Sequence, residues 1–486
     1  MANLQTLPNE LILRILGQFD VARVLALGQT CKRFHSIAFS KSAWVNIVLD
    51  LRARAFIDRR LAPDPGRLTS QELIALVKRV VQGPISWNLL PGANTIAPKI
   101  SARAVIDIQR PREINYRRLH LLPGGEHLFL LQDDVLECYA VVDGHRVWTS
   151  QSHSPEHRVL DLATELASDD KILALMILSP RHPAQERKTC LELIELVVRS
   201  GSSTQLFWLQ IDDVQPTHAT VFLAGDHFMF DPNSTLSPGQ LVFAVGNWRK
   251  GTIGAVSVPT SGLISESLAD GFLGLLTTHD TNELFVKRLS IVDVAQVSTM
   301  VTIKPNEPVE LRAIHFLPVA SFASTLTVDF EAPREGSNHS ISTFTIFKNP
   351  LSDDTSRIWF SLTTFPAPPA ASPTSEALHR LSLSYPLRGE RRLELRRSYS
   401  STIWRDAYKI FFSGHTQTTA HPTFRTERDG HSKKLLIHPD IADIAPVMVK
   451  YCDGENPPGV PSLWSSPYSG NWAYFSANRI IINYFE

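Results

Sequence analysis

Residues 7–16 read Leu-Pro-Asn-Glu-Leu-Ile-Leu-Arg-Ile-Leu, and this stretch decides how the rest of the chain is organised. A proline followed closely by a carboxylate suits a first helical turn, because proline needs no N–H there and the negative charge faces the positive end of the helix dipole. We place Pro8 at the first helical position. Apolar residues then recur at helical spacing from Leu11 to Phe19, which predicts an amphipathic helix.

Two further short helical runs follow before Trp44. One carries Val21, Val24 and Leu25, and the other places Leu27, Cys31, Phe34 and Ala38 on one face. Three short helices on so few residues form a segment of a size that seldom folds alone without a disulfide, a metal or a partner. This segment holds one cysteine and no cluster of metal-ligating residues. We therefore expect it to bind a partner protein.

The spacing of residues 7–44 resembles the F-box. The resemblance is carried by the pattern Leu-Pro-x-Glu-Leu-x(3)-Ile-Leu at residues 7–16, by Leu25, by Cys31-Lys32-Arg33-Phe34 and by Ala43-Trp44. F-box proteins dock onto the adaptor subunit of SCF-type cullin–RING ubiquitin ligases and present a substrate. This chain departs from the usual pattern in two places, since Asp20-Val21 replaces an acidic-Leu pair and Thr30 replaces a valine.

The resemblance implies a set of residues that contact the adaptor: Leu7, Pro8, Glu10, Leu11, Ile15, Leu16, Leu25, Leu27, Cys31 and Phe34. With Pro8 at the first helical position, Leu7 occupies the cap, where leucine is a poor choice. A residue that fits its local position badly is often kept for a contact elsewhere. The alternative is that residues 7–44 only cover the end of a larger domain.

Composition limits the function classes. A chain of 486 residues has room for two or three domains, and its equal numbers of basic and acidic residues give no global reason to bind nucleic acid or an acidic membrane. Four scattered cysteines without a CxxC pair suit a reducing compartment. The N-terminus lacks a signal-peptide pattern, and the longest apolar run, residues 172–178, is too short to span a bilayer. We expect a cytoplasmic or nuclear protein.

A helical linker is predicted between the F-box, at residues 4–46, and the remainder of the chain. Thr69 and Glu72 have the spacing of a capping box, which marks a helix start. The helix that follows shows Leu73, Leu76, Val77, Val80 and Val81 on one side, and Gly83-Pro84 ends it. We interpret residues 47–84 as a linker, with an ordinary surface helix as the alternative.

From residue 85 onward the pattern changes to short strands between turns. The clearest unit runs from Leu119 to Trp148, with an Asp143-Gly144 hairpin signal. Similar runs recur at 172–178, 191–198, 206–209, 219–223, 227–230, 241–245, 282–286, 311–317, 326–330, 342–347, 391–395 and 472–485. Units spaced by roughly 45–60 residues are typical of propeller blades. We predict an α+β multidomain chain in which residues 85–486 form a WD40-like β-propeller, with a pair of β-sandwiches as the alternative.

No motif predicts catalysis, a metal or a cofactor. His415, His421 and His431, with Asp429, fit no metal template. The aspartate pairs at 133–134, 169–170 and 212–213 each follow a strand, where aspartate commonly caps a turn. Arginines that could capture phosphate stand among glutamates and are interpreted as the solvent face of a strand: Arg388, Arg391, Arg392, Arg396 and Arg397.

We expect a non-enzymatic substrate receptor of an SCF-type ligase, with cullin and RING subunits as indirect partners and without nucleic-acid or membrane binding. Two alternatives remain open from the sequence. The β domain could itself be an enzyme, or the F-box could bind its adaptor outside a complete ubiquitin ligase.

Overall fold

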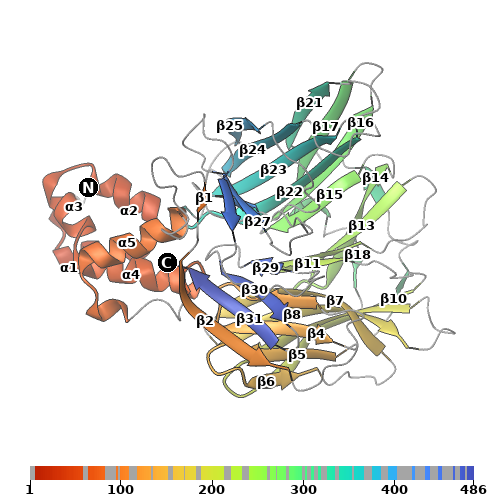
Figure 1. Cartoon of the computed structure of the whole chain (residues 1–486), viewed down its shortest axis with the longest axis horizontal. Helices are drawn as coiled ribbons and strands as arrows, with labels where there is room; N and C mark the ends of the chain where they lie inside the picture. The colour runs from red at the N-terminus through yellow and green to blue at the C-terminus, as the bar shows by residue number, and fades with distance from the viewer. Residues whose placement is uncertain are drawn as a thin grey trace.

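The structure is a computed structural model of the chain. It describes residues 6–58, 64–82, 95–96, 99–108, 118–132, 135–150, 157–168, 170–181, 188–212, 220–231, 240–259, 263–269, 271–280, 284–297, 301–303, 308–310, 316–318, 326–333, 339–352, 355–365, 375–384, 392–401, 419–421, 433–437, 447–450, 463–465, 471–476 and 479–485. Helices gather at one end of the chain and strands make up the rest (Figure 1).

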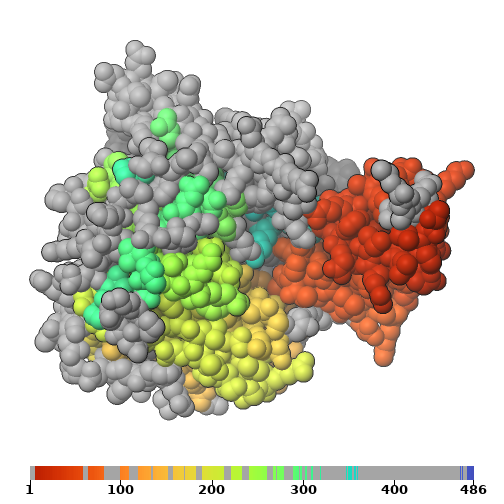
Figure 2. All heavy atoms as spheres, turned by 180° about the vertical axis from the view of Figure 1, so that it is seen from behind, coloured from red at the N-terminus to blue at the C-terminus, as the bar shows by residue number. Residues whose placement is uncertain are grey.

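The helices α1 to α5 form one unit at the N-terminal end, which we call the helical unit. Its helices are α1 (Asn9–Leu16), α2 (Val21–Gly28), α3 (Lys32–Ala38), α4 (Lys41–Ala53) and α5 (Ser70–Gln82), with the short 3-10 turn η2 (Pro65–Arg67) before α5. Figure 2 shows the helical unit as a projection from one side of the β body. The helical unit is therefore placed to meet a partner away from most of the sheets.

A single apolar core joins all five helices. Ile12 of α1, Val24 of α2, Trp44 of α4 and Leu73 of α5 belong to the same buried cluster. The predicted boundary at residues 46 and 47 falls inside α4, because Val48 and other residues of that core continue the helix beyond it. The helix predicted as a linker is thus part of the helical unit's core.

The capping box predicted for α5 is present. The backbone amide and the hydroxyl of Thr69 both donate to Glu72 Oε2, at 2.7 and 2.8 Å, and the amide of Glu72 donates back to the Thr69 hydroxyl at 3.3 Å. The hydrogen bond from the Thr69 amide, followed by that from its hydroxyl, lowers the pKa of Glu72. The predicted stop at residues 83–84 lies outside the described residues.

Seven sheets follow within the described part of the chain, and we number them in chain order. Sheet 1 contains β3 (Arg118–Leu121), β4 (His127–Gln132), β5 (Val135–Ala140) and β6 (Arg146–Thr149). Sheet 2 contains β7 (His157–Ser168), β8 (Lys171–Pro180), β9 (Lys188–Val197), β10 (Ser202–Asp212) and β19 (Val309–Glu310). Sheet 3 contains β11 (Val221–Ala224), β12 (His227–Phe230), β13 (Gln240–Asn247), β14 (Thr252–Pro259), β18 (Val301–Thr302) and β20 (Phe316–Pro318).

The remaining sheets continue the series. Sheet 4 contains β15 (Leu263–Ala269), β16 (Phe272–Asp280), β17 (Leu284–Asp293) and β21 (Leu326–Pro333), with the helical turn α6 (Val294–Val297) after β17. Sheet 5 contains β22 (His339–Lys348), β23 (Thr355–Phe365), β24 (Ser375–Ser384) and β25 (Arg392–Ser401). Sheet 6 contains β1 (Thr95–Ile96), β26 (Thr419–His421), β27 (Lys433–Ile437) and β28 (Val447–Lys450). Sheet 7 contains β2 (Ile100–Asp107), β29 (Leu463–Ser465), β30 (Trp472–Ser476) and β31 (Arg479–Phe485).

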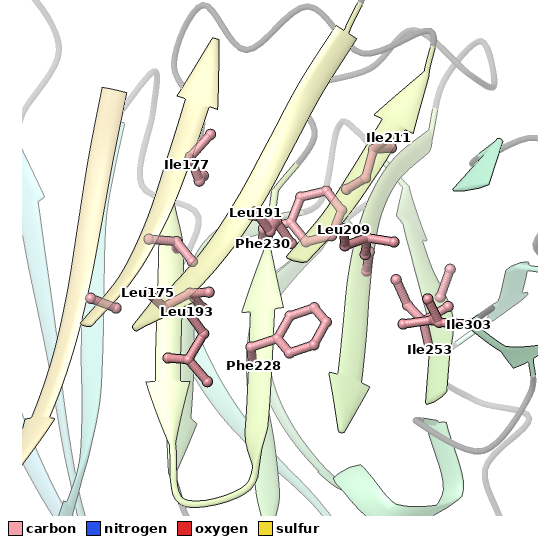
Figure 3. Packing of buried hydrophobic residues seen from close by; sticks show 14 of the residues in the cluster. Leu175, Ile177, Leu191, Leu193, Leu209, Ile211, Phe228, Phe230, Ile253 and Ile303 are labelled. Carbon is pink, nitrogen blue, oxygen red and sulfur yellow. The ribbon is translucent and has the colours of Figure 1, made fainter. Parts of the chain in front are cut away.

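Central sheets are buried on both faces. In β8, Ala174 and Met176 pack against sheet 1, whereas Leu175 and Ile177 pack against Phe228 and other residues of sheet 3 (Figure 3). A strand buried on both faces needs no polar alternation, which explains the continuous apolar run of β8. The sheet of a two-layer sandwich buries one face only. The sandwich alternative is therefore wrong.

Contacts between sheets follow their order in the chain. β29 of sheet 7 contacts β3 of sheet 1, and the series continues from β5 to β7, from β7 to β11, from β11 to β15 and from β15 to β22. Strand β2, from the beginning of the β region, pairs with β31 at its end. Consecutive small, mostly antiparallel sheets, the last of which is completed by a strand from the beginning of the β region, are arranged as in a β-propeller. The predicted propeller-like fold is confirmed.

Candidate functional site

The first turn of α1 lies one residue later than predicted. Pro8 occupies the N-cap position, with its carbonyl accepting from the amides of Leu11 and Ile12 at 3.1 and 3.2 Å. The placement of Pro8 at the first helical position is thus wrong. Its ψ of 149° is extended, so the helix begins only at Asn9. The helix also ends at Leu16, before Phe19, which is exposed in the turn that follows.

Arg33 of α3 anchors the start of α1. Its Nη2 donates to the Leu7 carbonyl at 2.5 Å and to Asn9 Oδ1 at 2.9 Å. These bonds reach across from the third helix to the two residues that flank Pro8. The sequence pattern contains Arg33, yet this role appears only in the structure.

The N-terminal half of α1 presents an apolar surface. Leu11 is 44% exposed. Pro8 and Glu10 are also exposed, and Leu7 and Ile15 are half-buried. These five residues of the predicted contact set can therefore meet a partner without any rearrangement of the helical unit.

The other predicted contact residues divide into two groups. Leu25, Leu27 and Cys31 are half-buried and pack against the helical core with part of each side chain. Leu16 and Phe34 are 3% and 5% exposed, so they are core residues with little surface to offer. We leave these two out of the candidate surface, because their side chains are buried in the core beneath it.

Two local features hold α2 in place beside α3. Asp20 Oδ1 accepts from the amide of Arg23 at 2.8 Å, so Asp20 is the N-cap of α2. A capping carboxylate satisfies an amide that the helix leaves unpaired. At the other end, Gly28 lets α2 approach α3, since an added Cβ would lie 3.1 Å from the Ala38 Cβ. The candidate surface thus rests on α1, α2 and α3 held by specific contacts.

A comparison with family models finds a match for the N-terminal helices. The model described as F-box-like matches residues 4–50. Residues 4–50 are an F-box-like domain. This match covers α1, α2, α3 and most of α4, so it ends beyond the predicted boundary at residue 46. The chain carries the F-box-like domain at its N-terminal end and a propeller-like β domain after it.

Comparisons of the whole chain with curated proteins and with solved structures identify no close relative. No curated protein matches the chain. The WD40 domain of SCAP from fission yeast is similar with a TM-score of 0.43 and 8% identity, covering 76% of this chain and 84% of that one. The complex of the fission yeast SREBP–SCAP binding domains gives a TM-score of 0.34 at 8% identity, covering 66% and 80%. At such scores we assign the fold from the sheets and their contacts alone.

The residues considered for other chemistry do not form a site in the described part of the chain. No group of three or more possible metal ligands occurs there. Asp170 lies in the turn before β8 and accepts from the Ser168 hydroxyl at 3.2 Å, and Asp212 ends β10. Residues outside the described part are Asp133, Asp134, Asp169, Asp213, Arg388, Arg391, His415, Asp429 and His431. The side chains of His421, Arg392, Arg396 and Arg397 are also not described.

No helix among the described residues is long and apolar enough to cross a membrane. The buried thiol of Cys138 has its pKa raised to about 12 by loss of solvation. A thiol with such a pKa stays protonated at neutral pH and is a poor nucleophile.

Proposed function

We propose that this protein is a substrate-recognition subunit of an SCF-type cullin–RING ubiquitin ligase. The F-box-like domain would dock onto the adaptor subunit, and the β domain would present a target protein in the cytoplasm or nucleus. The observation that carries the proposal is the exposed Pro8 and Leu11 surface of α1, within a segment that matches the F-box-like model.

The geometry supports docking by an intact helical unit. Core residues such as Leu16 and Phe34 remain inside, while Leu11 and Ile15 stand at the surface. Burying a central apolar side chain in a partner typically contributes most of the energy of such a contact. Replacement of Leu11 by alanine should cost on the order of 2 kcal/mol of association, about thirtyfold in Kd.

The receptor itself would form no covalent bond. By holding a lysine of the target near a charged ubiquitin carrier, it would raise the effective concentration of one reactant beside the other. Bond formation would belong to other subunits. F-box-like and propeller-like domains are both typically interaction modules, which is consistent with this division of work.

The test is binding of purified adaptor to the full-length chain. Pro8→Ala/Leu11→Asp should abolish retention of the adaptor, because a carboxylate would be buried in an apolar contact. Leu49→Asp is the matched control, since Leu49 of α4 is 48% exposed and lies outside the predicted contact set. Equal retention of the adaptor by wild type and by the Pro8/Leu11 variant would refute the docking proposal.

A second experiment tests whether the protein is a subunit of a complete ligase or binds the adaptor outside one. The receptor–adaptor complex is mixed with the cullin and RING subunits and separated by size. A ligase subunit should migrate with all of them, and ubiquitin transfer to proteins captured by the β domain should depend on Leu11. Adaptor binding without incorporation of the cullin would exclude the ligase role.

A further inference from the structure

The helical unit is attached to sheet 5 through the turn between β22 and β23. The amide of Ala22, in the first turn of α2, donates to the Leu351 carbonyl at 2.9 Å. Arg54 Nη2, at the end of α4, donates to the Pro350 carbonyl at 3.1 Å. The Leu351 side chain packs against the apolar core of the helical unit. One turn of the β domain thus contributes both polar and apolar contacts to the helices.

Hydrogen bonds within the turn itself also hold its shape. Asn349 Oδ1 accepts from the amide of Leu351 at 3.1 Å, and Asn349 Nδ2 donates to the Thr355 hydroxyl at 2.5 Å. A side chain that bonds to the backbone two residues later fixes the turn locally. The next residue back, Lys348, pairs with Glu165 of β7 at 3.1 Å, so the base of the turn is also tied to sheet 2.

A second attachment joins the helical unit to sheets 1 and 7. Asp58, buried after α4, accepts a hydrogen bond from the side chain of Asn471, which is also buried. Gly125, in the turn between β3 and β4, lies against Asp58 and accepts from the Tyr484 hydroxyl at 2.8 Å. Arg79 of α5 donates to the carbonyl of Phe485, the last residue of β31.

The two attachments lie on different sheets of the β domain. Described contacts between sheets run from sheet 7 through sheets 1, 2, 3 and 4 to sheet 5. The helical unit contacts sheets 7 and 1 through Asp58 and Arg79, and sheet 5 through Ala22 and Arg54. Figure 1 shows the helices beside the chain's C-terminal strand β31, on the side where β2 pairs with it.

We infer that the helical unit is a clamp that holds sheet 5 to sheets 1 and 7, through Ala22 and Arg54 on sheet 5 and through Asp58 and Arg79 on sheets 1 and 7. The F-box-like helices and the β domain then move as one rigid body. Opening either attachment should loosen strands at the other, because both attachments are held by the same helices. The inference concerns the fold and stands whether or not the adaptor binds.

Hydrogen–deuterium exchange of the full-length chain without a partner tests the clamp. Leu351→Asp places a charge against the helical core and should release the sheet 5 attachment. Exchange should become about tenfold faster or more at Ala22, and also at the distant strands β2 and β31. Leu206→Asp is the matched control, since Leu206 is an exposed leucine of β10, and it should leave all of these amides unchanged.

A milder variant covers the case in which Leu351→Asp does not fold. Arg54→Met keeps an unbranched apolar side chain and removes the donor to the Pro350 carbonyl, so it should accelerate exchange at the same strands by a smaller factor. Faster exchange confined to Ala22 and the β22–β23 turn, with β2 and β31 unchanged in the folded variant, overturns the clamp. Unchanged exchange at Ala22 in both variants overturns the attachment itself.

Discussion

Gly28 of α2 and Ala38 of α3 approach so closely that a Cβ added to Gly28 would lie 3.1 Å from the Ala38 Cβ. Gly28→Val should therefore push α2 away from α3 and destabilise the helical unit by about 1–3 kcal/mol, the usual cost of overpacking. Thermal unfolding followed by helix circular dichroism measures this cost. Adaptor affinity should fall as well, because Leu25 and Leu27 move with α2.

Gly17→Ala provides the control for that substitution. Gly17 follows α1 with a φ of −65°, and an added Cβ would make only ordinary contacts, at 3.5 Å and beyond. This variant should be as stable as wild type or slightly more stable. A similar loss of stability in both variants would show that the close approach of α2 and α3 is not what Gly28 provides.

Arg33 should strengthen adaptor binding without belonging to an apolar contact. Its bonds to the Leu7 carbonyl and to Asn9 Oδ1 fix the residues on either side of Pro8. Arg33→Met should weaken adaptor binding by about 1 kcal/mol, roughly fivefold in Kd, because the start of α1 must be ordered on binding. Titration calorimetry with purified adaptor gives the value. The neighbouring Lys32→Met removes the same charge, and equal weakening by both variants would argue for charge instead of anchoring.

The junction between the helical unit and the β domain depends on a glycine at residue 125. Gly125 has a φ of +68°, and an added Cβ would lie 2.8 Å from Asp58 Oδ1. Gly271 has a similar φ of +78° with nothing within 4 Å of an added Cβ. Alanine at Gly271 should cost the backbone strain alone, about 1–2 kcal/mol, whereas alanine at Gly125 should cost the strain plus the clash. Urea denaturation of both variants measures the difference, and equal losses would mean that Asp58 yields freely.

The sequence predicted most of the elements whose signal is local. The Thr69 and Glu72 capping box, the hairpins of sheet 1 and the apolar run of β8 all follow from neighbouring residues, and all are present. Pro8 was misplaced by one position, because its proline ring suits both the N-cap and the first helical residue. Helix ends are decided by such small differences.

Features that depend on distant residues could not be predicted. Strand β7, which is not among the predicted runs, carries Asp161 and Glu165. Their carboxylates accept from the amides of Val221 and Gly225, at 3.2 and 2.6 Å, and these amides belong to the next sheet. Similarly, Leu351 gives no sign in the sequence that its carbonyl meets Ala22. Such pairings exist only after the sheets have assembled.

Glu266 of β15 should make the stability of the β domain depend on pH. The pKa of its carboxyl is raised from 4.5 to about 7, mainly by burial. The negative charge of Asp231 also raises this pKa, and the hydrogen bond from the Thr220 hydroxyl lowers it by a smaller amount. Between pH 4.5 and 7 the folded chain therefore binds more protons at this site than the unfolded chain. The free energy of unfolding should therefore fall by about 3 kcal/mol as the pH rises through this window. Above pH 7 it should no longer change through this group.

Glu266→Gln isolates this contribution from the histidines that titrate in the same range. The amide is neutral at every pH, so the variant should match wild type near pH 4.5 and exceed its stability at pH 8 by up to about 3 kcal/mol. Asp231→Asn should recover a smaller part of that difference, since it removes only the neighbouring charge. Urea denaturation at several pH values gives the free energies. A constant difference between wild type and Glu266→Gln across the range would show that the carboxyl of Glu266 titrates alike in the folded and unfolded chains.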